Sequence, residues 1–358
     1  MSSKGNQLDF TGVNIYAGID AHLKNWRITI MTEDLFHKTF SSDPSAKSLA
    51  CYLRKNFPNG NYYSAYEAGF CGYSAHRSLL EEGIKNIVVN PADVPTTDKE
   101  RKQKEDSRDS RKIARALING DLEQIYIPTR ATEELRGFIR YRKSVVRDIS
   151  RYKARIKSFL YRHGIDIPFE YYSASKYWSS NFTEWLKTIK LSTDYGHIVL
   201  LKTLETVNQL RAKLLHMNRE LRTISGQDQY KSQVKYLTSI PGIGIISAMT
   251  ILAELETMLR FSNLSKLCSY IGLVPTTNSS SDKEKAGGLS PRCNRLLREV
   301  IVESAWVAAR NDPALSLAYS KLCTRMKRTN AIIRIAKKLL GRVRYVLINE
   351  VEYKYAIV

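Results

Sequence analysis

Two long runs of helical periodicity constrain what this chain can fold into. From about Arg130 to Arg162, apolar residues recur at spacings of three and four, as they do on one face of a helix. A second run is close to a heptad seam and consists of Leu204, Val207, Leu210, Leu214, Met217, Leu221 and Ile224. Apolar stripes of this kind are buried against a partner helix. We therefore predict a helical, coiled-coil-like segment over 130–225, with its helices paired either within the chain or, as we prefer, between protomers.

The part before the first long helix has a different pattern. Four short apolar segments predict β-strands, at 13–20, 26–30, 62–66 and 84–89. Helices are expected between the later strands, at about 45–56 and 73–82. Strands that alternate with helices indicate an α/β domain with a mixed central sheet over residues 13–125.

The last part of the chain, 234–358, is predicted to be a mainly helical domain. It opens with Ile240-Pro241-Gly242-Ile243-Gly244, which resembles the turn of a helix-hairpin-helix. Glycines at such a turn let backbone N–H groups approach a phosphate at the start of a helix. An ordinary tight turn is the alternative. Further along, residues 274–288 are predicted to form a loop.

Charge indicates a polyanionic partner. The 358 residues include 56 Lys and Arg against 35 Asp and Glu, for a formal net charge of +21. Neutralising phosphates would give such a chain most of its affinity for nucleic acid, although ribosomal and membrane-surface proteins share the composition. Basic residues on the first long helix favour a phosphate-tracking surface over an ordinary solvated face. The candidate nucleic-acid-binding residues are Arg136, Arg140, Lys143, Arg147, Arg151, Arg155, Gly242, Gly244, Arg292 and Arg295.

Aromatic residues are concentrated between the two long helices. They are Phe169, Tyr171, Tyr172, Tyr177, Trp178, Phe182 and Trp185. Aromatic side chains in a nucleic-acid-binding protein can stack on unpaired bases. A place in a core or an interface is the more common role for such residues, and it stays open here.

Cysteine usage and the start of the chain bear on location. Cys51, Cys71, Cys268, Cys293 and Cys323 are scattered without C-x₂-C spacing, which indicates reduced thiols and neither a zinc site nor a disulfide framework. The first twelve residues are polar, and no apolar run approaches the roughly eighteen residues of a membrane span. We expect a cytoplasmic protein with no membrane partner.

Four acids occur in settings that suit a metal site. Asp106 and Asp109 lie three residues apart on a predicted helix that is rich in basic residues, so both face the same way. Asp20 ends the first predicted strand, and Glu67 follows the strand at 62–66. Carboxylate oxygens suit Mg²⁺, and two ions bridged by shared carboxylates can stabilise both the attacking and the leaving oxygen at a phosphate. A solvated helix face is the alternative for the pair alone.

These acids resemble the DEDD set of the RuvC-like (RNase H-like) domain in the insertion sequence 110 family of transposases, which are relatives of the Piv DNA invertase. A second set near the other end of the chain resembles the second half of that family. It consists of Tyr270-Ile271-Gly272-Leu273-Val274-Pro275, Ser279-Ser280, Gly287-Gly288, Asn294 and Leu297-Arg298. The two sets occur in the family order and span nearly the whole chain.

The resemblance implies a DNA recombinase that moves an insertion sequence. It implies a RuvC-like metal-binding domain, strand exchange through a phosphoserine intermediate, and donor and target DNA as partners. It also implies a structured guide RNA, two Mg²⁺ ions (or Mn²⁺ in their place) on Asp20, Glu67, Asp106 and Asp109, and a C-terminal transposase domain. Because recombination joins two duplexes, we expect a homo-oligomer, either a dimer or a tetramer.

Position selects Ser280 as the predicted nucleophile, since the family places its serine five residues after the proline that is Pro275 here. Ser279 is the alternative. The chain departs from the family pattern at Ser281, where glycine is usual, at Pro291-Arg292-Cys293, and at Glu105. A RuvC-like nuclease that activates water and a non-catalytic nucleic-acid-binding protein remain the other functional classes.

Overall fold

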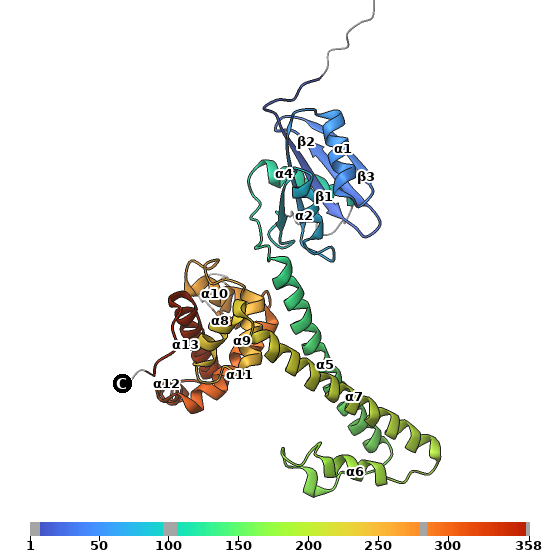
Figure 1. The fold of residues 1–358 in the computed structure, drawn as a ribbon, viewed down its shortest axis with the longest axis vertical. Coiled ribbons are helices and arrows are strands. Elements are labelled where there is room, and N and C mark those ends of the chain that lie inside the picture. Colours follow the sequence, from blue (N-terminus) through green and yellow to red (C-terminus); the bar gives the residue numbers. More distant parts are fainter. Residues whose placement is uncertain (1–7, 96–105, 279–284, 356–358) are drawn as a thin grey trace, which may run out of the picture. The chain divides into compact units, whose positions relative to one another are not determined.

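The computed structural model describes residues 8–95, 106–278 and 285–355 of the chain (Figure 1). The chain divides into two compact units, Met1–Ile127 and Pro128–Val358, and each is described here by itself. The finer division into domains at 13–125, 130–225 and 234–358 stays a prediction. Within the described residues, no helix combines the length and the apolar character needed to cross a bilayer.

The N-terminal unit is built on a five-stranded mixed sheet with the order β3-β2-β1-β4-β5. Its strands are β1 (Asn14–Ala21), β2 (Trp26–Met31), β3 (Phe36–Ser42), β4 (Asn61–Glu67) and β5 (Lys85–Val89). β1, β4 and β5 run parallel, whereas β2 is antiparallel to both β1 and β3. The predicted mixed sheet is therefore confirmed. β3 was not predicted, and it forms one edge of the sheet.

In the part of this unit that the structure describes, the helices α1 (Ala46–Asn56), α2 (Ser74–Glu81) and α4 (Asp106–Ile118) cover the two faces of the sheet. Leu49 of α1 and Leu79 of α2 belong to the same buried cluster as Ile15 and Ile19 of β1. Because side chains alternate between the two faces of a strand, Gly18 and Asp20 lie on the opposite face from Ile19. That opposite face is the one that α4 covers.

Gly18 allows the backbone of α4 to lie directly on β1. A Cβ atom at this position would be 2.1 Å from the carbonyl oxygen of Ser110 and 2.4 Å from the backbone nitrogen of Ala114. Next to this contact, the hydroxyls of Ser110 and Thr29 are 2.9 Å apart and hydrogen-bonded. Both Ser110 and Ala114 are fully buried. The position of α4, and with it that of Asp106 and Asp109, therefore depends on a residue without a side chain.

We expect Gly18→Ala to displace α4, because the added methyl group would meet backbone atoms that cannot rotate away. Overpacking of this kind should lower the free energy of unfolding by about 2 kcal/mol or more. Hydrogen exchange of the α4 amides measures the effect locally, and these amides should lose protection. Gly69→Ala is the matched control, since the nearest atom to its Cβ would be 3.8 Å away. Equal protection of α4 in the two variants would contradict the assignment.

In the second unit the two long helices pack against each other within the chain. They are α5 (Arg130–Arg162) and α7 (Asp194–Ser225), which lie side by side in Figure 1. Leu204 and Val207 of the predicted seam are buried with Ile156 and Leu160 of α5. The seam is thus used for pairing within the chain, the arrangement that the sequence left open as the alternative. Assembly into a dimer or tetramer stays a prediction.

Most of the aromatic segment belongs to the core at the far end of this helical pair. Phe182 of α6 (Ser180–Thr188) is fully buried, and Trp178 is 8% exposed. The ring of Phe182 makes edge-on contacts with Tyr171, Tyr177 and Trp178. They belong to one apolar cluster with Ile156 and Leu160 of α5 and Leu200 and Leu204 of α7. Phe169 and Tyr172 remain exposed and available for other contacts.

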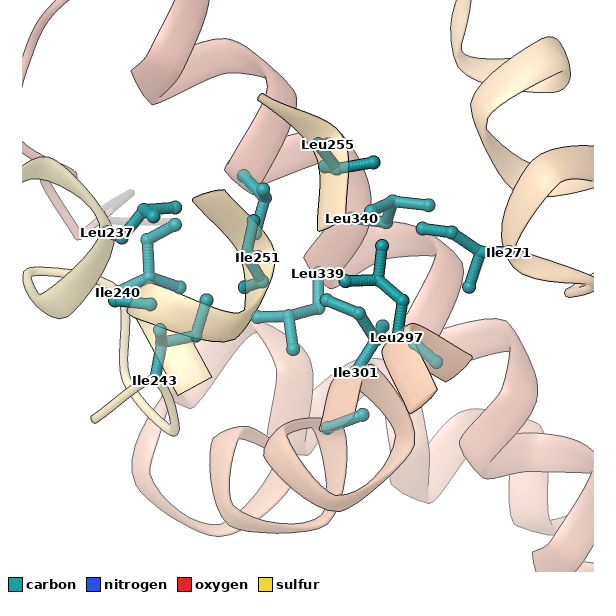
Figure 2. Packing of buried hydrophobic residues seen from close by; sticks show 14 of the residues in the cluster. Leu237, Ile240, Ile243, Ile251, Leu255, Ile271, Leu297, Ile301, Leu339 and Leu340 are labelled. Atoms are coloured by element: carbon teal, nitrogen blue, oxygen red, sulfur yellow. The ribbon is translucent and has the colours of Figure 1, made fainter. Parts of the chain in front are cut away.

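The remainder of the second unit is a cluster of six helices around one apolar core (Figure 2). The helices are α8 (Asp228–Thr238), α9 (Ile245–Leu255), α10 (Leu264–Ile271), α11 (Arg295–Asn311), α12 (Pro313–Cys323) and α13 (Arg328–Asn349). Leu135 and Ile139 of α5 join this core, so the base of the long hairpin is part of the cluster. The predicted mainly helical C-terminal part is confirmed.

The predicted loop at 274–288 is wrong in its detail. The structure has a two-stranded antiparallel ribbon there, formed by β6 (Pro275–Asn278) and β7 (Lys285–Leu289). Pro275 is paired with Leu289 and Asn278 with Lys285, and the Ser290 N–H donates to the Val274 carbonyl at 3.0 Å. Backbone pairing forms these strands without any apolar pattern. Ser279, Ser280 and Ser281 lie outside the described residues, in the segment that connects Asn278 to Lys285.

A buried carboxylate holds the end of the chain against this cluster. Asp312 caps α12 by accepting the Leu315 N–H at 2.9 Å, and it also accepts hydrogen bonds from Arg342 and from the Tyr353 hydroxyl. Burial raises the pKa of Asp312, but these three donors outweigh it and the pKa is lowered overall. Burial and the bond to Asp312 raise the pKa of Tyr353 to about 12. The Tyr353 N–H also donates to Ser239 at 2.7 Å.

Candidate functional site

Two of the predicted acids lie at the ends of neighbouring strands. Asp20 is the next-to-last residue of β1, and Glu67 is the last residue of β4. The register of these parallel strands pairs Ile19 with Tyr66, the residues directly before the two acids. Both acids are half-buried. The fold therefore places Asp20 and Glu67 side by side at the C-terminal ends of two neighbouring inner strands.

The other two acids belong to the helix that crosses this face. Asp109 is half-buried and directly precedes Ser110, the residue that contacts Gly18 and Thr29. Asp106 is the first residue of α4, one turn before Asp109, and its side chain lies outside the described part of the chain. Docking of α4 over β1 thus places the helical pair on the same face of the sheet as Asp20.

His22 is a residue of this site that the sequence analysis missed. Its Nε2 atom is 3.1 Å from Oδ2 of Asp20. The backbone N–H of His22 donates to the Asn25 carbonyl at 3.0 Å. This bond closes the turn between β1 and β2 and fixes the backbone beside Asp20. A histidine two residues after a predicted metal ligand was the available signal.

The chemistry of the donor set fits a hard divalent cation. Carboxylate oxygens are the ligands that Mg²⁺ and Mn²⁺ prefer. Among the residues whose side chains the structure describes, no three Asp, Glu, His or Cys side chains already converge as a metal cluster. Asp20, Glu67 and Asp109 are among those residues but form no such group, and Asp106 is not among them, so the four-acid metal site stays a prediction.

The second set of motif residues holds the base of the β6–β7 ribbon. Gly272 ends α10 with φ +77°, and a Cβ there would be 2.4 Å from the Cβ of Cys293. Arg298 donates to the carbonyl oxygens of Gly272 at 3.3 Å and Ser290 at 2.9 Å. The chain segments that enter and leave the ribbon are therefore held together by one glycine contact and one guanidinium.

Asn294 and Tyr270 extend this connection. The side chain of Asn294 caps α11 by accepting the Leu297 N–H at 3.0 Å, and its backbone N–H donates to the Tyr270 carbonyl at 2.9 Å. Its Nδ2 atom also donates to Oε2 of Glu254 at 2.7 Å. The predicted motif residues around Ser280 are thus in contact with one another, whereas Glu254 was not predicted at all.

Glu254, the acid that Asn294 contacts, is fully buried, with 0% of the residue exposed. Arg140 binds it with two hydrogen bonds, from Nε to Oε1 at 2.8 Å and from a terminal nitrogen to Oε2 at 2.9 Å. Burial raises the pKa of Glu254, but hydrogen bonds and charge from Arg140, with help from Asn294 and Arg136, lower it overall. The carboxylate is therefore charged at neutral pH.

The predicted basic surface of α5 divides into two groups. Arg136 is 8% exposed and donates to the carbonyl oxygens of Ala253 and Glu254 at 2.5 and 3.1 Å, so its guanidinium is used inside the fold. Arg140 and Lys143 face outward in part, but they pair with Glu254 and Glu299. Arg147, Arg151 and Arg155 are exposed toward the far end of the hairpin, and Arg151 pairs with Asp148 at 2.9 Å.

The two glycines of the predicted helix-hairpin-helix turn have different surroundings. Gly242 has φ +92°, and a Cβ there would be 2.4 Å from the Ser304 carbonyl oxygen of α11. Packing against α11 is sufficient reason for this glycine. Gly244 is exposed at the start of α9, with open space where its Cβ would be. Arg292 and Arg295 are also exposed, near the start of α11.

Both units match models of one transposase family. Residues 17–165, which contain the four acids, match the DEDD-type transposase model of the IS110 family, and residues 234–320, which contain Ser280, match the model described as "Transposase IS116/IS110/IS902 family". The chain belongs to the IS110 family of transposases. The family that the sequence motifs predicted is therefore confirmed.

This transposase is similar to known relatives over much of its length. It is 28% identical to the putative transposase y4qE of Sinorhizobium fredii over 68% of the chain and 58% of that relative. It is 23% identical to the transposase for insertion sequence element IS1533 of Leptospira borgpetersenii, over 82% of the chain and 84% of the relative. For the putative transposase y4rJ of Sinorhizobium fredii the identity is 26%, over 91% and 90%.

The division of the basic residues can be tested with two arginines of the same helix. Arg155→Ala should weaken nucleic-acid binding and reduce the salt slope of the affinity by about 1, with unchanged stability. Arg136→Ala should instead remove the guanidinium donor from the buried carbonyl groups of Ala253 and Glu254 and lower the free energy of unfolding by about 1–3 kcal/mol. Binding titrations at several salt concentrations, with thermal unfolding, separate the two effects. A normal melting temperature together with a reduced slope in Arg136→Ala would contradict the buried role.

Proposed function

We propose that this transposase is a DNA recombinase that cuts and rejoins strands of an insertion sequence through a phosphoserine at Ser280. The observation that carries the proposal is the match of both units to the family, with the four acids in one and the serine motif in the other. The contacts of Gly272, Arg298 and Asn294 support it, because they hold both ends of the ribbon that leads to Ser280.

In this proposal the serine forms the covalent bond. The Ser280 oxygen bonds to the scissile phosphorus as the bond to one strand oxygen breaks, and that oxygen takes up a proton. Attack by a hydroxyl of the partner strand then restores a phosphodiester and releases the serine, without net hydrolysis. A serine hydroxyl is a poor nucleophile unless a base or a metal assists it, and no histidine lies near it in the sequence.

In this proposal the four acids would supply that assistance. Asp20, Glu67, Asp106 and Asp109 would hold Mg²⁺, and the bound ions would neutralise phosphate charge and lower the pKa of a coordinated hydroxyl. His22 contributes by contacting the Asp20 carboxylate. The exposed arginines of α5 would contact the phosphates of donor and target DNA, and of the structured guide RNA that the family resemblance implies. A homo-oligomer would bring two duplexes together.

The metal site is tested by replacing one acid at a time. Asp20→Asn, Glu67→Gln, Asp106→Asn and Asp109→Asn should each reduce DNA cleavage at least about 100-fold, because each removes a carboxylate from a shared site. Chelation of divalent cations should have the same effect on the wild type. RNA binding should persist, since it depends on distant basic residues. Asp34→Asn, an exposed acid of the same unit, is the control. DNA cleavage at the wild-type rate by Asp106→Asn would contradict the assignment of this residue to the metal site.

The nucleophile is tested by trapping the covalent protein–DNA adduct. Ser280→Ala should form no adduct and no exchanged product, whereas Ser279→Ala should form both. Peptide mapping by mass spectrometry should place the modification on Ser280. Continued DNA cutting by Ser280→Ala, with water as the nucleophile, would indicate the RuvC-like nuclease instead. An adduct on Ser279 or Ser281 would show that the serine is misassigned.

A further inference from the structure

A fully buried charge in an apolar helix requires an explanation. Glu254 lies in the sequence Ile-Leu-Ala-Glu-Leu of α9, a helix whose residues from Ala248 to Leu255 are all buried. Moving a carboxylate from water into such surroundings is unfavourable unless hydrogen bonds and an opposite charge compensate it. A leucine would fill this space without that cost. The contacts of Glu254 therefore indicate what the charge is for.

Three N–H donors converge on its two oxygens. Two come from Arg140 of α5, at 2.8 and 2.9 Å, and the third is Nδ2 of Asn294, at 2.7 Å. The Glu254 backbone carbonyl accepts from Arg136 at 3.1 Å and from the Tyr270 hydroxyl at 3.4 Å. One residue thus connects the long helix α5 with both Tyr270 and Asn294.

Tyr270 and Asn294 stand on either side of the β6–β7 ribbon. Tyr270 precedes Gly272, where the chain leaves α10 for β6, and Asn294 follows β7 as the cap of α11. The backbone bond between them, from the Asn294 N–H to the Tyr270 carbonyl at 2.9 Å, closes the base of the ribbon. The buried Glu254 carboxylate accepts a hydrogen bond from the Asn294 side chain and so contacts the base of the ribbon from inside the domain.

We propose that Glu254 is a positioning residue for strand transfer. Its bond to Asn294 holds the base of the ribbon that leads to Ser280, and its bonds to Arg140 keep the Glu254 carboxylate in place. This inference rests on the proposed function of Ser280. Only a carboxylate accepts from all three donors at once. An amide in its place would turn one oxygen into an NH₂ group and set a donor against a donor. Small displacements of reacting groups reduce rates strongly, by about 100-fold for about 1 Å.

Two variants test the same contact from opposite sides. Glu254→Gln keeps the size of the side chain and removes its charge. Asn294→Ser keeps a good cap for α11 but is too short to reach Glu254, so it removes that bond together with the 3.4 Å bond from the same nitrogen to the Tyr270 hydroxyl. Glu256→Gln is the matched control, because Glu256 also holds α5, through Thr129 and Thr132, yet lies beyond the end of α9.

Single-turnover adduct formation at saturating DNA gives both a rate and an amplitude. We expect Glu254→Gln and Asn294→Ser to lower the rate by about 10–100-fold at unchanged amplitude and DNA affinity. In the double variant the rate should fall by less than the two single effects combined, since both substitutions disrupt the contact between Glu254 and Asn294. Glu256→Gln should stay within about twofold of wild type. A loss of amplitude at the wild-type rate would mean a purely structural role, and Asn294→Ser at the wild-type rate would overturn the proposal even if Glu254→Gln fails to fold.

Hydrogen exchange separates this inference from the proposed function. The amides of Ser290 and Asn294 are bonded across the base of the ribbon, and the Leu297 amide is bonded to the Asn294 side chain. All three should exchange faster in Glu254→Gln than in Glu256→Gln. Absence of any covalent protein–DNA adduct in the wild type would contradict the proposed function, but the exchange measurement would still test the positioning role of Glu254. Unchanged exchange in Glu254→Gln would remove the positioning role while leaving the serine chemistry intact.

Discussion

The ion pair between Arg140 and Glu254 is the constraint on which the second unit depends. Leaving the fully buried carboxylate of Glu254 without its partner is destabilising, because that charge then lacks compensation, whereas Arg140 itself is partly exposed. Helices α5 and α9 therefore cannot separate without exposing Glu254. Since Leu135 and Ile139 of α5 also belong to the C-terminal core, the long hairpin and the helical cluster form one structure. The basic surface of α5 is held in register with the motif around Gly272 and Asn294.

The sequence predicted those parts of the fold that carry a local apolar pattern. β1 and β4 are both largely apolar or aromatic runs with an acid at or near the end, and both were found. β3 was not, because most of its residues are exposed at the edge of the sheet and no alternation marks it. β6 and β7 are short and polar, and only the pairing of their backbones, between residues such as Pro275 and Leu289, makes them strands.

The candidate site was predictable to the extent that its residues have local signals. Strand ends and a spacing of three residues were enough to select the four acids. Nothing local distinguishes Arg136 from Arg155, which are the same residue type on the same helix, and only the packing of α9 makes Arg136 a buried donor. Glu254 lies 114 residues from Arg140, and its neighbours are apolar, so neither its charge partner nor its contact with Asn294 could be inferred.

The bonds of Tyr353 have a practical consequence for labelling this protein. Its hydroxyl satisfies Asp312 and its backbone N–H reaches Ser239, so the last described residues are tied to the interior of the domain. A reporter attached after Tyr355 leaves both bonds in place. A tag that replaces the residues from Glu350 onward would expose a buried carboxylate and loosen α12 and α13. Fluorescent or affinity labels intended to follow this transposase on DNA should therefore be added beyond this tyrosine and not in exchange for it.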